Sequence, residues 1–147
     1  MDFSTKALAE ITKLVAEEIG KRIEAGEINN LDDLENGIRK MLKEIGQQIY
    51  REVLENEDMK LGVRVRCECG MKAKRISKRN AKVLSVFGWV RYRRLYYGCS
   101  RCGKKQNRLD KDWGIHPGEV SPVLGKLLAI ASMPFLVYLW SYDSTDF

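Results

Sequence analysis

Two short stretches, Cys67-Glu68-Cys69-Gly70 and Cys99-Ser100-Arg101-Cys102-Gly103, contain all four cysteines of this 147-residue chain. Four thiolates supplied by two short turns are a ligand set that a tetrahedral, structural zinc ion binds well. The glycine after each pair lets the backbone turn so that amide groups face the sulfurs. We therefore predict one Zn²⁺ ion bound by Cys67, Cys69, Cys99 and Cys102, in the arrangement of a zinc ribbon.

The spacing of the first pair leaves other interpretations of the cysteines open. Only one residue separates Cys67 from Cys69, which is tighter than usual, whereas Cys99 and Cys102 have the common two-residue spacing. The cysteines could be buried without a metal, joined as disulfides, or part of an iron–sulfur cluster or redox dithiol. If zinc is bound, four sulfur ligands leave no open position for a substrate, so we expect a structural metal and not a catalytic one.

The segments around the cysteines have the side-chain patterns that are typical of β-strands. Residues 63–66 alternate apolar and basic side chains, and residues 81–87 and 89–97 are rich in β-branched and aromatic types, with Gly88 between them. This pattern predicts a short strand followed by a β-hairpin that lies between the two cysteine turns.

Residues 1–59 have the pattern of two amphipathic helices. Apolar residues recur at spacings of three and four, first over residues 8–23 and then over residues 31–53. Asn30 can cap the second helix, which is expected over about residues 31–56. The sequence favours a helical hairpin that packs the two apolar stripes together within one chain. Pairing between chains is the alternative, because a lone hairpin buries little core, and we expect a homodimer to form through these helices.

The last part of the chain is expected to contain a loop, a short helix and an apolar tail. Ser121 and Pro122 are a typical cap and first-turn residue, and Pro134 is expected to end the helix that they begin. The apolar run over residues 127–140 is shorter than the roughly 20 residues that a membrane-spanning helix takes. We therefore expect no membrane segment.

Charge divides the chain into three parts. Residues 1–59 have a net charge of −6, residues 60–108 have +15 from 16 Lys and Arg against one acid, and residues 109–147 have −3. We therefore expect an α+β protein with a helical unit over 1–59, a zinc ribbon with a basic hairpin over 60–108, and the loop, short helix and tail over 109–147. So dense a basic segment is typical of proteins that bind a polyanion.

The basic side chains of the middle segment are the candidate contacts to nucleic acid, most simply DNA. They are Arg64, Arg66, Lys72, Lys74, Arg75, Lys78, Arg79, Lys82, Arg91, Arg93, Arg94, Lys104, Lys105 and Arg108. Neutralising phosphates with release of counterions is the physical use of such a strip. Two alternatives remain: a face that binds an acidic partner chain, and a solvated surface that balances the acidic helices within a dimer.

Aromatic residues are interleaved with the basic strip. These are Trp89, Tyr92, Tyr96 and Tyr97 of the second hairpin strand, whose rings could stack on bases if exposed. Tyr92 and Tyr96 share a strand face with Val90, so we expect these two tyrosines in the small core of the ribbon.

The sequence offers no arrangement typical of an enzyme or of a small-molecule site. It lacks a nucleophile–base pair, a phosphate-binding glycine loop and a convincing carboxylate cluster, and its only histidine, His116, lies in a predicted turn. The first residues do not have the pattern of a secretory leader, and paired cysteines favour metal over disulfide in a reducing compartment. We expect a non-enzymatic protein of the cytoplasm.

The order of these motifs resembles that of a known family. A Cys-x-Cys-Gly turn, a basic stretch, a hairpin over residues 83–97 and a Cys-x-x-Cys-Gly turn are followed by Leu109-Asp110 and Trp113-Gly114-Ile115. This order is similar to the N-terminal region of the Kra-type insertion-sequence (DDE) transposases and of a related transposase-like family. The likeness covers about residues 60–131, and the sequence departs from the family pattern after Ala131.

The resemblance implies a zinc-ribbon, DNA-binding front end of a transposase. In that family a DDE catalytic domain with an RNase-H-like fold lies further downstream. The chain ends before such a domain, so the resemblance implies a truncated remnant of a transposase or a natural short derivative, which would bind DNA without strand transfer. It gives no residue of this chain a catalytic role.

Overall fold

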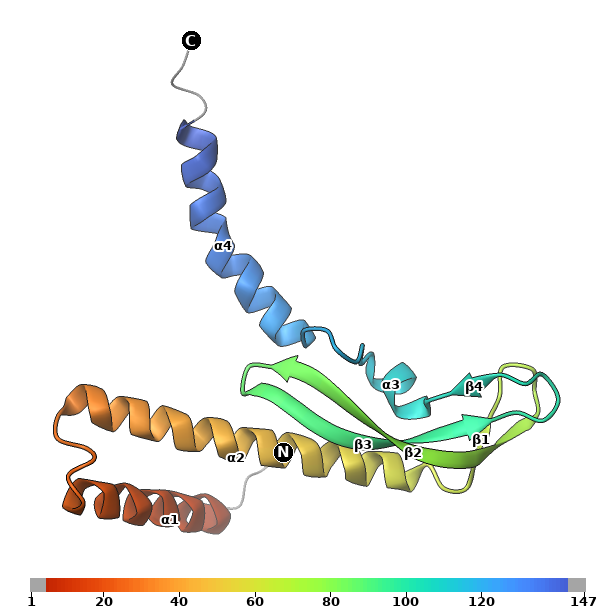
Figure 1. Ribbon diagram of the computed structural model, residues 1–147, viewed down its shortest axis with the longest axis horizontal. Coiled ribbons are helices and arrows are strands. Elements are labelled where there is room, and N and C mark those ends of the chain that lie inside the picture. The colour runs from red at the N-terminus through yellow and green to blue at the C-terminus, as the bar shows by residue number, and fades with distance from the viewer. Residues whose placement is uncertain (1–4, 143–147) are drawn as a thin grey trace. The chain divides into compact units, whose positions relative to one another are not determined.

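The computed structural model describes residues 5–142 and has the α+β fold expected from the sequence (Figure 1). The elements in chain order are α1 (Thr5–Glu24), α2 (Leu31–Lys60), β1 (Arg64–Arg66), β2 (Lys72–Ser85), β3 (Gly88–Gly98), β4 (Lys105–Gln106), α3 (Arg108–Trp113) and α4 (Pro122–Tyr142). The chain divides into two compact units, Met1–Gly46 and Gln47–Phe147, whose boundary falls inside α2. The three-part division by charge stays a prediction.

In the first unit, the connection between α1 and α2 contains the signals that end one helix and begin the next. Gly26 follows α1 with a φ of 74°, a left-handed conformation that glycine adopts without a steric penalty. The side-chain oxygen of Asn30 accepts a hydrogen bond from the backbone N–H of Asp33 at 2.9 Å. This bond confirms Asn30 as the N-cap of α2.

The apolar stripes of the first unit remain largely on its surface. Ile19 and Ile28 are the buried apolar side chains among its described residues. Gly37 of α2 makes room for them, because a Cβ there would lie 3.1 Å from Ile28. In contrast, Leu31 and Leu42 are 68% and 51% exposed. Inside one chain, the two helices therefore leave several residues of their stripes exposed and others only partly buried.

The second unit is built on one antiparallel sheet whose strand order, β1-β2-β3-β4, follows the chain. The long β2–β3 pair forms its centre, with Lys74 opposite Gly98 at one end, Ser85 opposite Gly88 at the other, and a bulge at Ile76. Because neighbouring strands run in opposite directions, the β1–β2 and β3–β4 turns lie at the same end of the sheet.

The predicted hairpin is present, but its first strand is longer than expected. β2 begins at Lys72 rather than near Ala81. Its first half is dominated by Lys and Arg, which have low β-propensity, so cross-strand pairing and not local preference defines the strand there. Gly88 has a φ of 94°, which suits the tight two-residue connection between β2 and β3.

Two small clusters of buried side chains stabilise the second unit. The cluster beside the cysteine turns contains Val65, Cys67, Ala73, Leu95, Tyr97 and Cys99. The other cluster joins the second half of α2 and helix α3 to the hairpin. It contains Leu54 of α2, Val83, Val90 and Tyr92 of the sheet, and Leu109 of α3. Of the two tyrosines expected in the core, Tyr92 is buried at 2% exposed, whereas Tyr96 is only half-buried.

The segment after the sheet contains a short helix that the sequence analysis did not predict. The side chain of Asn107 accepts a hydrogen bond from the backbone N–H of Asp110 at 2.7 Å and so caps α3. Gly114, with a φ of 61°, ends the helix. Its buried residue, Leu109, anchors it to the hairpin. The cap residues were visible in the sequence, but a helix this short has little periodicity to detect.

The connection from α3 to α4 pairs with the outer edge of β2. The backbone N–H of Leu84 donates to Glu119 at 3.0 Å, and that of Ser121 donates back to Leu84 at 2.8 Å. His116 lies earlier in this connection with an exposed side chain.

Helix α4 begins where the sequence predicts, with the Ser121 hydroxyl accepting from the N–H of Leu124 at 3.3 Å. It continues to Tyr142 and therefore passes Pro134, where the sequence analysis placed its end. A proline inside a helix removes one hydrogen bond, so its effect is local and turns on either side can persist. The prediction for the apolar tail concerns side chains beyond Ser132, which are outside those described. Across residues 5–142, no helix combines the length and apolar character needed to cross a bilayer.

Candidate metal centre and basic sheet

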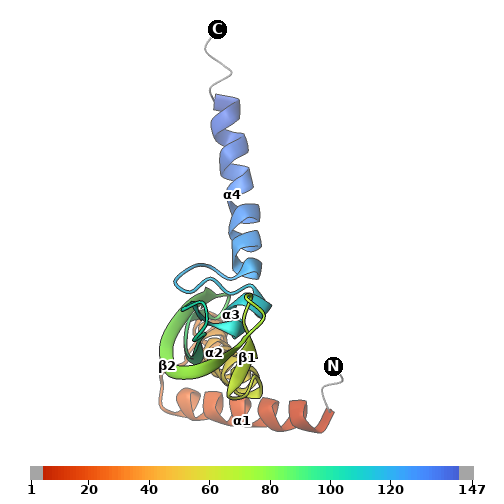
Figure 2. The same ribbon diagram turned by 90° about the vertical axis from the view of Figure 1, so that its right-hand side faces the viewer.

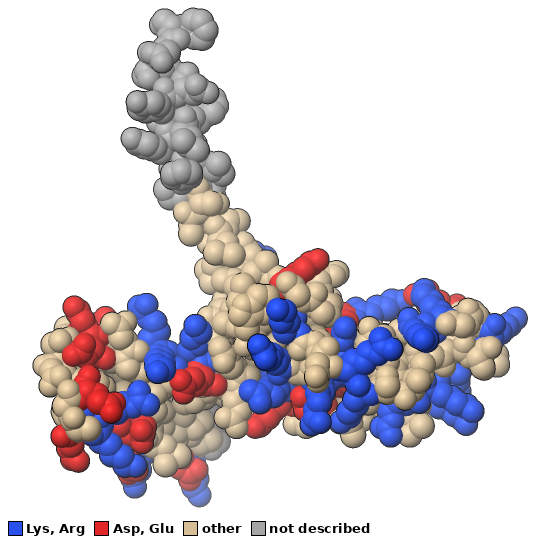
Figure 3. All heavy atoms as spheres, viewed as in Figure 1, with Lys and Arg blue, Asp and Glu red and all other residues tan. Residues whose placement is uncertain are grey.

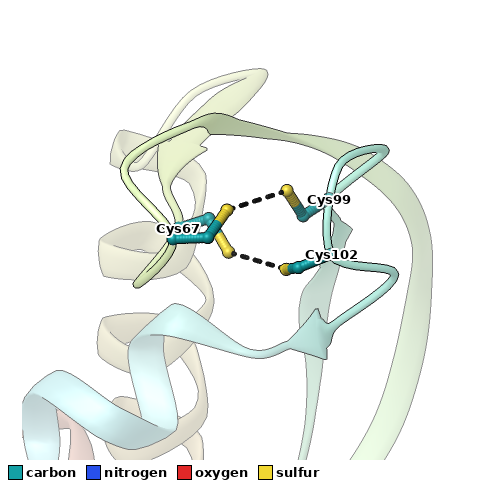
Figure 4. Close-up of side chains that lie close together, drawn as sticks. Cys67, Cys99 and Cys102 are labelled. Carbon is teal, nitrogen blue, oxygen red and sulfur yellow. Dashed lines mark hydrogen bonds between the residues drawn. The ribbon is translucent and has the colours of Figure 1, made fainter.

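The four cysteine sulfurs meet at one end of the sheet. All four Sγ atoms lie within 4.8 Å of one another. The distance is 3.6 Å between Cys67 and Cys102 and 3.5 Å between Cys69 and Cys99, and Figure 4 shows the sulfurs of the two turns pointing toward each other. These distances are far longer than the roughly 2.0 Å bond of a disulfide. The four cysteines are therefore free thiols.

The order of the strands explains why these cysteines meet. Cys67 and Cys69 lie in the turn from β1 to β2, and Cys99 and Cys102 lie in the turn from β3 to β4. Figure 2, turned by 90° from Figure 1, shows the strands of the sheet end-on. The antiparallel order returns the chain to the same end of the sheet for both turns.

Each cysteine turn is closed by a hydrogen bond from its glycine. The N–H of Gly70 donates to the carbonyl of Cys67 at 3.0 Å, and the N–H of Gly103 donates to the carbonyl of Cys99 at 2.9 Å. The φ angles of these glycines are 86° and 69°, a region where a side chain would be strained. The backbone curl predicted for these glycines is confirmed.

The surroundings of Cys99 and Cys69 shift the pKa values of the two thiols in opposite directions. Backbone N–H groups of Cys102 and Arg101 lower the pKa of the Cys99 thiol to about 6. The N–H of Met71 also favours the thiolate of Cys69, but the neighbouring Cys99 sulfur and burial outweigh it and raise the pKa of Cys69 to about 11. Two thiolates so close repel each other, and a central cation removes that repulsion.

The separations of the sulfurs fit a single metal ion. With metal–sulfur bonds of about 2.3 Å, a tetrahedral site places its sulfurs about 3.8 Å apart. The observed spread brackets this value, with two separations of 3.5 and 3.6 Å and none above 4.8 Å. The single-residue spacing of the first pair therefore does not prevent the four sulfurs from converging on one ion.

The acidic residue between the first two cysteines connects the cluster to two lysines. The carboxylate of Glu68 pairs with Lys104 and, at 2.6 Å, with Lys111. The hydrogen bond from Lys104, followed by that from Lys111, lowers the pKa of Glu68 to about 2. Since Lys104 follows the second cysteine turn, this pair links the two turns independently of any metal.

All the predicted phosphate contacts except Arg108, which belongs to α3, lie on the sheet and its turns, and Figure 3 shows Lys and Arg side chains gathered along the part that the strands form. The exposed ones are Arg64, Arg66, Lys72, Lys74, Arg75, Lys78, Arg79, Lys82, Arg91, Arg93, Lys104 and Lys105. In the hairpin some of them face one another across the strands, as Lys82 does Arg91. Like charges directly opposite destabilise a sheet, so this arrangement has a cost that a bound anion would remove.

Arg94 and Arg108 are the two predicted contacts that are not exposed. Arg94 pairs with Asp110 of α3, and both side chains are 12% exposed. Asp110 also accepts a hydrogen bond from the hydroxyl of Tyr92 at 3.1 Å. Arg108 pairs with Asp112 at 2.9 Å within α3. The contacts of Arg94 attach α3 to the sheet.

Cations of the hairpin rest on aromatic rings. The guanidinium groups of Arg79 and Arg94 lie 4.4 and 5.3 Å from the ring centre of Tyr96, which is half-buried. The ammonium of Lys82 lies 4.6 Å from the ring of Trp89, which is 45% exposed. Cation–π contacts of this kind are worth about 0.5–1 kcal/mol at exposed sites. They fix the positions of cations that would otherwise be mobile.

The contact between the second half of α2 and the hairpin is not predicted from the sequence. Glu55 accepts a hydrogen bond from the backbone N–H of Arg93 at 2.9 Å, and the buried Asp58 accepts one from the N–H of Leu95. The i, i+3 spacing of the two acids places them on one side of the helix. That spacing was visible, but no local pattern indicates which strand the two carboxylates meet.

Comparisons of the chain with protein-family models, curated proteins and solved structures found no match. The likeness to transposase front ends therefore stays an expectation from sequence motifs. Any assignment of function rests on the sulfur cluster, the basic sheet and their geometry.

Proposed function

We propose that this chain is a DNA-binding module whose basic sheet is held in shape by one structural zinc ion. The observation that carries the proposal is that the four sulfurs meet in the turns at one end of the sheet whose strands carry most of the exposed cations. The metal closes the sheet at one end, and the strands that leave this end present the basic side chains.

Zinc is the proposed metal because all four donors are sulfur. Thiolates select zinc among the common divalent ions, and zinc accepts four of them in tetrahedral geometry. A complete sulfur shell leaves no position for a substrate, so the ion has a structural role. The buried cluster beside the cysteines is small, and binding of the metal then contributes directly to folding.

DNA is the proposed partner because the exposed cations are poorly matched by acids. Within residues 60–108 the only acid is Glu68, and two lysines already pair with it. Four thiolates and Zn²⁺ together add −2, which leaves this segment at about +13. A duplex neutralises such a surface with its phosphates and releases condensed counterions. The resemblance of the motif order to transposase front ends supports the same partner.

A second copy of the chain is the proposed partner of the first unit. Leu31, Ile38 and Leu42 are exposed on α2, and Leu8 and Ile23 are exposed on α1. Large uncovered apolar areas mark association sites on soluble proteins. A second copy presents the same stripe, which makes a self-complementary pair possible without another partner.

The experiment that tests the proposal measures metal content and DNA binding on the same sample of the full chain. We expect about one zinc per chain and an affinity for a duplex that falls steeply with salt, by about 0.9 log units per log unit of salt for each phosphate contacted. A folded, reduced sample with less than about half a zinc per chain would contradict the zinc assignment. Iron in place of zinc would reassign the metal.

A control polymer separates DNA from an acidic protein partner. Polyglutamate is also a polyanion but lacks phosphates. DNA binding that does not change with salt, or tighter binding of polyglutamate than of DNA at the same salt, would sink the nucleic-acid assignment. The second result would favour the alternative, a subunit that binds an acidic chain through its basic face.

A further inference from the structure

A hollow of about 760 Å³ lies between the second half of α2 and the β2–β3 hairpin. On the sheet side it is lined by three successive cross-strand pairs, from Asn80 opposite Arg93 to Lys82 opposite Arg91. On the helix side it is lined by Arg51 and Glu55. All of these residues belong to the second unit.

The charges around the hollow are strongly unbalanced. Four cations, Arg51, Lys82, Arg91 and Arg93, face a single carboxylate. That carboxylate, on Glu55, accepts the backbone N–H of Arg93 at 2.9 Å and lies 4.0 Å from its guanidinium. The other three cations have no ion-pair partner among the residues that the structure describes. The hollow therefore favours an anion.

The position of one of these cations is set by an aromatic ring. The Lys82 ammonium lies 4.6 Å from the ring of Trp89, which holds it over the sheet beside Arg91. Arg51 comes from a different element, the helix. Cations that line one hollow from both a helix and a sheet focus the electric field and attract an anion to that place. Cations spread along one strand attract anions without defining a single position.

The size and exposure of the hollow indicate which anion it takes. Its volume is within the range of about 300–1,000 Å³ that is typical of ligand sites, and larger than a single inorganic phosphate needs. The side chains of Arg91 and Arg93 are exposed, so the hollow opens to solvent and a long chain can pass along it. A phosphodiester with its attached sugars meets both conditions.

We propose that this hollow is where the protein holds the sugar–phosphate backbone of bound DNA, with Arg51, Lys82 and Arg91 contacting phosphates. The inference rests on the proposed function and narrows it to one place on the sheet. It also adds a residue of α2 to the interface, although residues 1–59 are acidic as a whole.

The sharpest test substitutes an arginine of the helix. Arg51→Gln removes a cation of the hollow, and Arg39→Gln removes the same charge from an exposed position of the same helix outside it. Binding of a fluorescent duplex to zinc-loaded full chain is measured over a series of salt concentrations. We expect Arg51→Gln to weaken binding and to reduce the salt slope by about 1, with Arg39→Gln close to the parent.

A second pair of variants applies the same test to the sheet. The double substitution Lys82→Gln with Arg91→Gln is compared with Arg64→Gln and Arg66→Gln, which removes two exposed cations from β1. We expect the first double variant to lose about tenfold or more in affinity and about 2 in salt slope, and the second to lose clearly less. Zinc content and circular dichroism confirm that each variant is folded.

The outcomes separate the inference from the proposed function. If the parent shows no salt-dependent DNA binding, the proposed function fails. If the parent binds but the hollow variants and their controls lose affinity equally, the inference alone fails. A final arm adds inorganic phosphate in place of chloride at equal ionic strength. Displacement of DNA by phosphate at submillimolar concentration would show a site for free anions and would overturn the assignment to a nucleic-acid backbone.

Discussion

The carboxylate of Asp58, near the end of α2, accepts a hydrogen bond from the backbone N–H of Leu95 on β3. One turn earlier, Glu55 accepts from the N–H of Arg93 at 2.9 Å. Side chains on one helix face lie about 5–6 Å apart, and alternate residues of a strand lie roughly 6.8 Å apart. The spacing of the two carboxylates on the helix therefore nearly matches that of the two N–H groups on the strand. Because β3 pairs with β4 only at its end, α2 satisfies donors on an otherwise open strand edge.

Removing the Asp58 carboxylate tests how much this contact stabilises the second unit. Asp58 is 1% exposed, so Asp58→Ala leaves the N–H of Leu95 without its acceptor in a buried place. We expect a loss of about 1–3 kcal/mol in the free energy of unfolding, measured by urea denaturation of the zinc-loaded chain. Asn56→Ala, an exposed position of the same helix, is the control and should be nearly neutral.

The isosteric variant Asp58→Asn tests the charge. Burial raises the pKa of Asp58 above its ordinary value of 3.8, against opposing effects of the Leu95 N–H, Lys78 and Arg94. The folded state therefore binds the proton more tightly than the unfolded chain, and this contribution is full below pH 3.8 and lost as pH rises through the raised pKa. The parent should lose stability relative to Asp58→Asn over that window. A difference that stays constant with pH would contradict the raised pKa.

The ion pair between Arg94 and Asp110 is expected to stabilise the attachment of α3 to the sheet. Both side chains are 12% exposed, and removing one partner leaves the other charge poorly solvated. Asp110→Ala should cost about 3 kcal/mol, whereas replacing both residues by apolar ones should cost less than the sum of the single changes. A double-mutant cycle by urea denaturation measures the coupling, and additive effects would show that the pair does not fasten α3 to the sheet.

Removal of the metal is expected to unfold the cysteine end of the sheet. Cys102→Ser removes one of the four clustered sulfurs, and Ser100→Ala changes the same turn without touching the cluster. Chelation, or the Cys102 substitution, should abolish protection of β1 and β4 amides from hydrogen exchange, because the metal contributes folding free energy there. Restored protection on adding zinc to the chelated parent completes the test. Protection that survives chelation would mean that the cysteines pack without a metal.

The features that sequence reasoning predicted well are those whose signals are local. The N-cap at Asn30, the Ser121-Pro122 helix start and the turn glycines each depend on residues within a few positions. The convergence of the four sulfurs also followed from motif spacing, since tetrahedral coordination by four sulfurs restricts the ways in which two cysteine turns can meet.

The features that were missed depend on contacts between distant segments. Asp58 and Leu95 are 37 residues apart, and nothing local to either predicts the other. Arg94 has the sequence context of the exposed arginines beside it, but its partner Asp110 comes from a helix too short to show a period. The first half of β2 is a strand because β1 and β3 pair with it, against the preference of its basic residues.

The exposed stripe of the first unit gives the last prediction. Ile38 of α2 is 37% exposed and lies between Leu31 and Leu42, which are more exposed still. If a second copy covers this stripe, Ile38→Glu places a charge in the interface and should raise the dimer dissociation constant about tenfold or more. Asn36→Glu adds the same charge at an exposed polar position of the same helix and should leave association unchanged.

Sedimentation equilibrium at several protein concentrations measures this association, and circular dichroism checks that the helices persist in each variant. A parent chain that stays monomeric at about 100 μM, or equal dissociation constants for the two variants, would rule out pairing through the stripe. Dimerisation would also strengthen DNA binding. Once one basic sheet of a dimer has bound a duplex, the second sheet is held close to the same duplex, at an effective concentration that depends on how the two sheets are connected. Ile38→Glu should then weaken DNA binding without changing zinc content, which separates the contribution of the assembly from that of the metal.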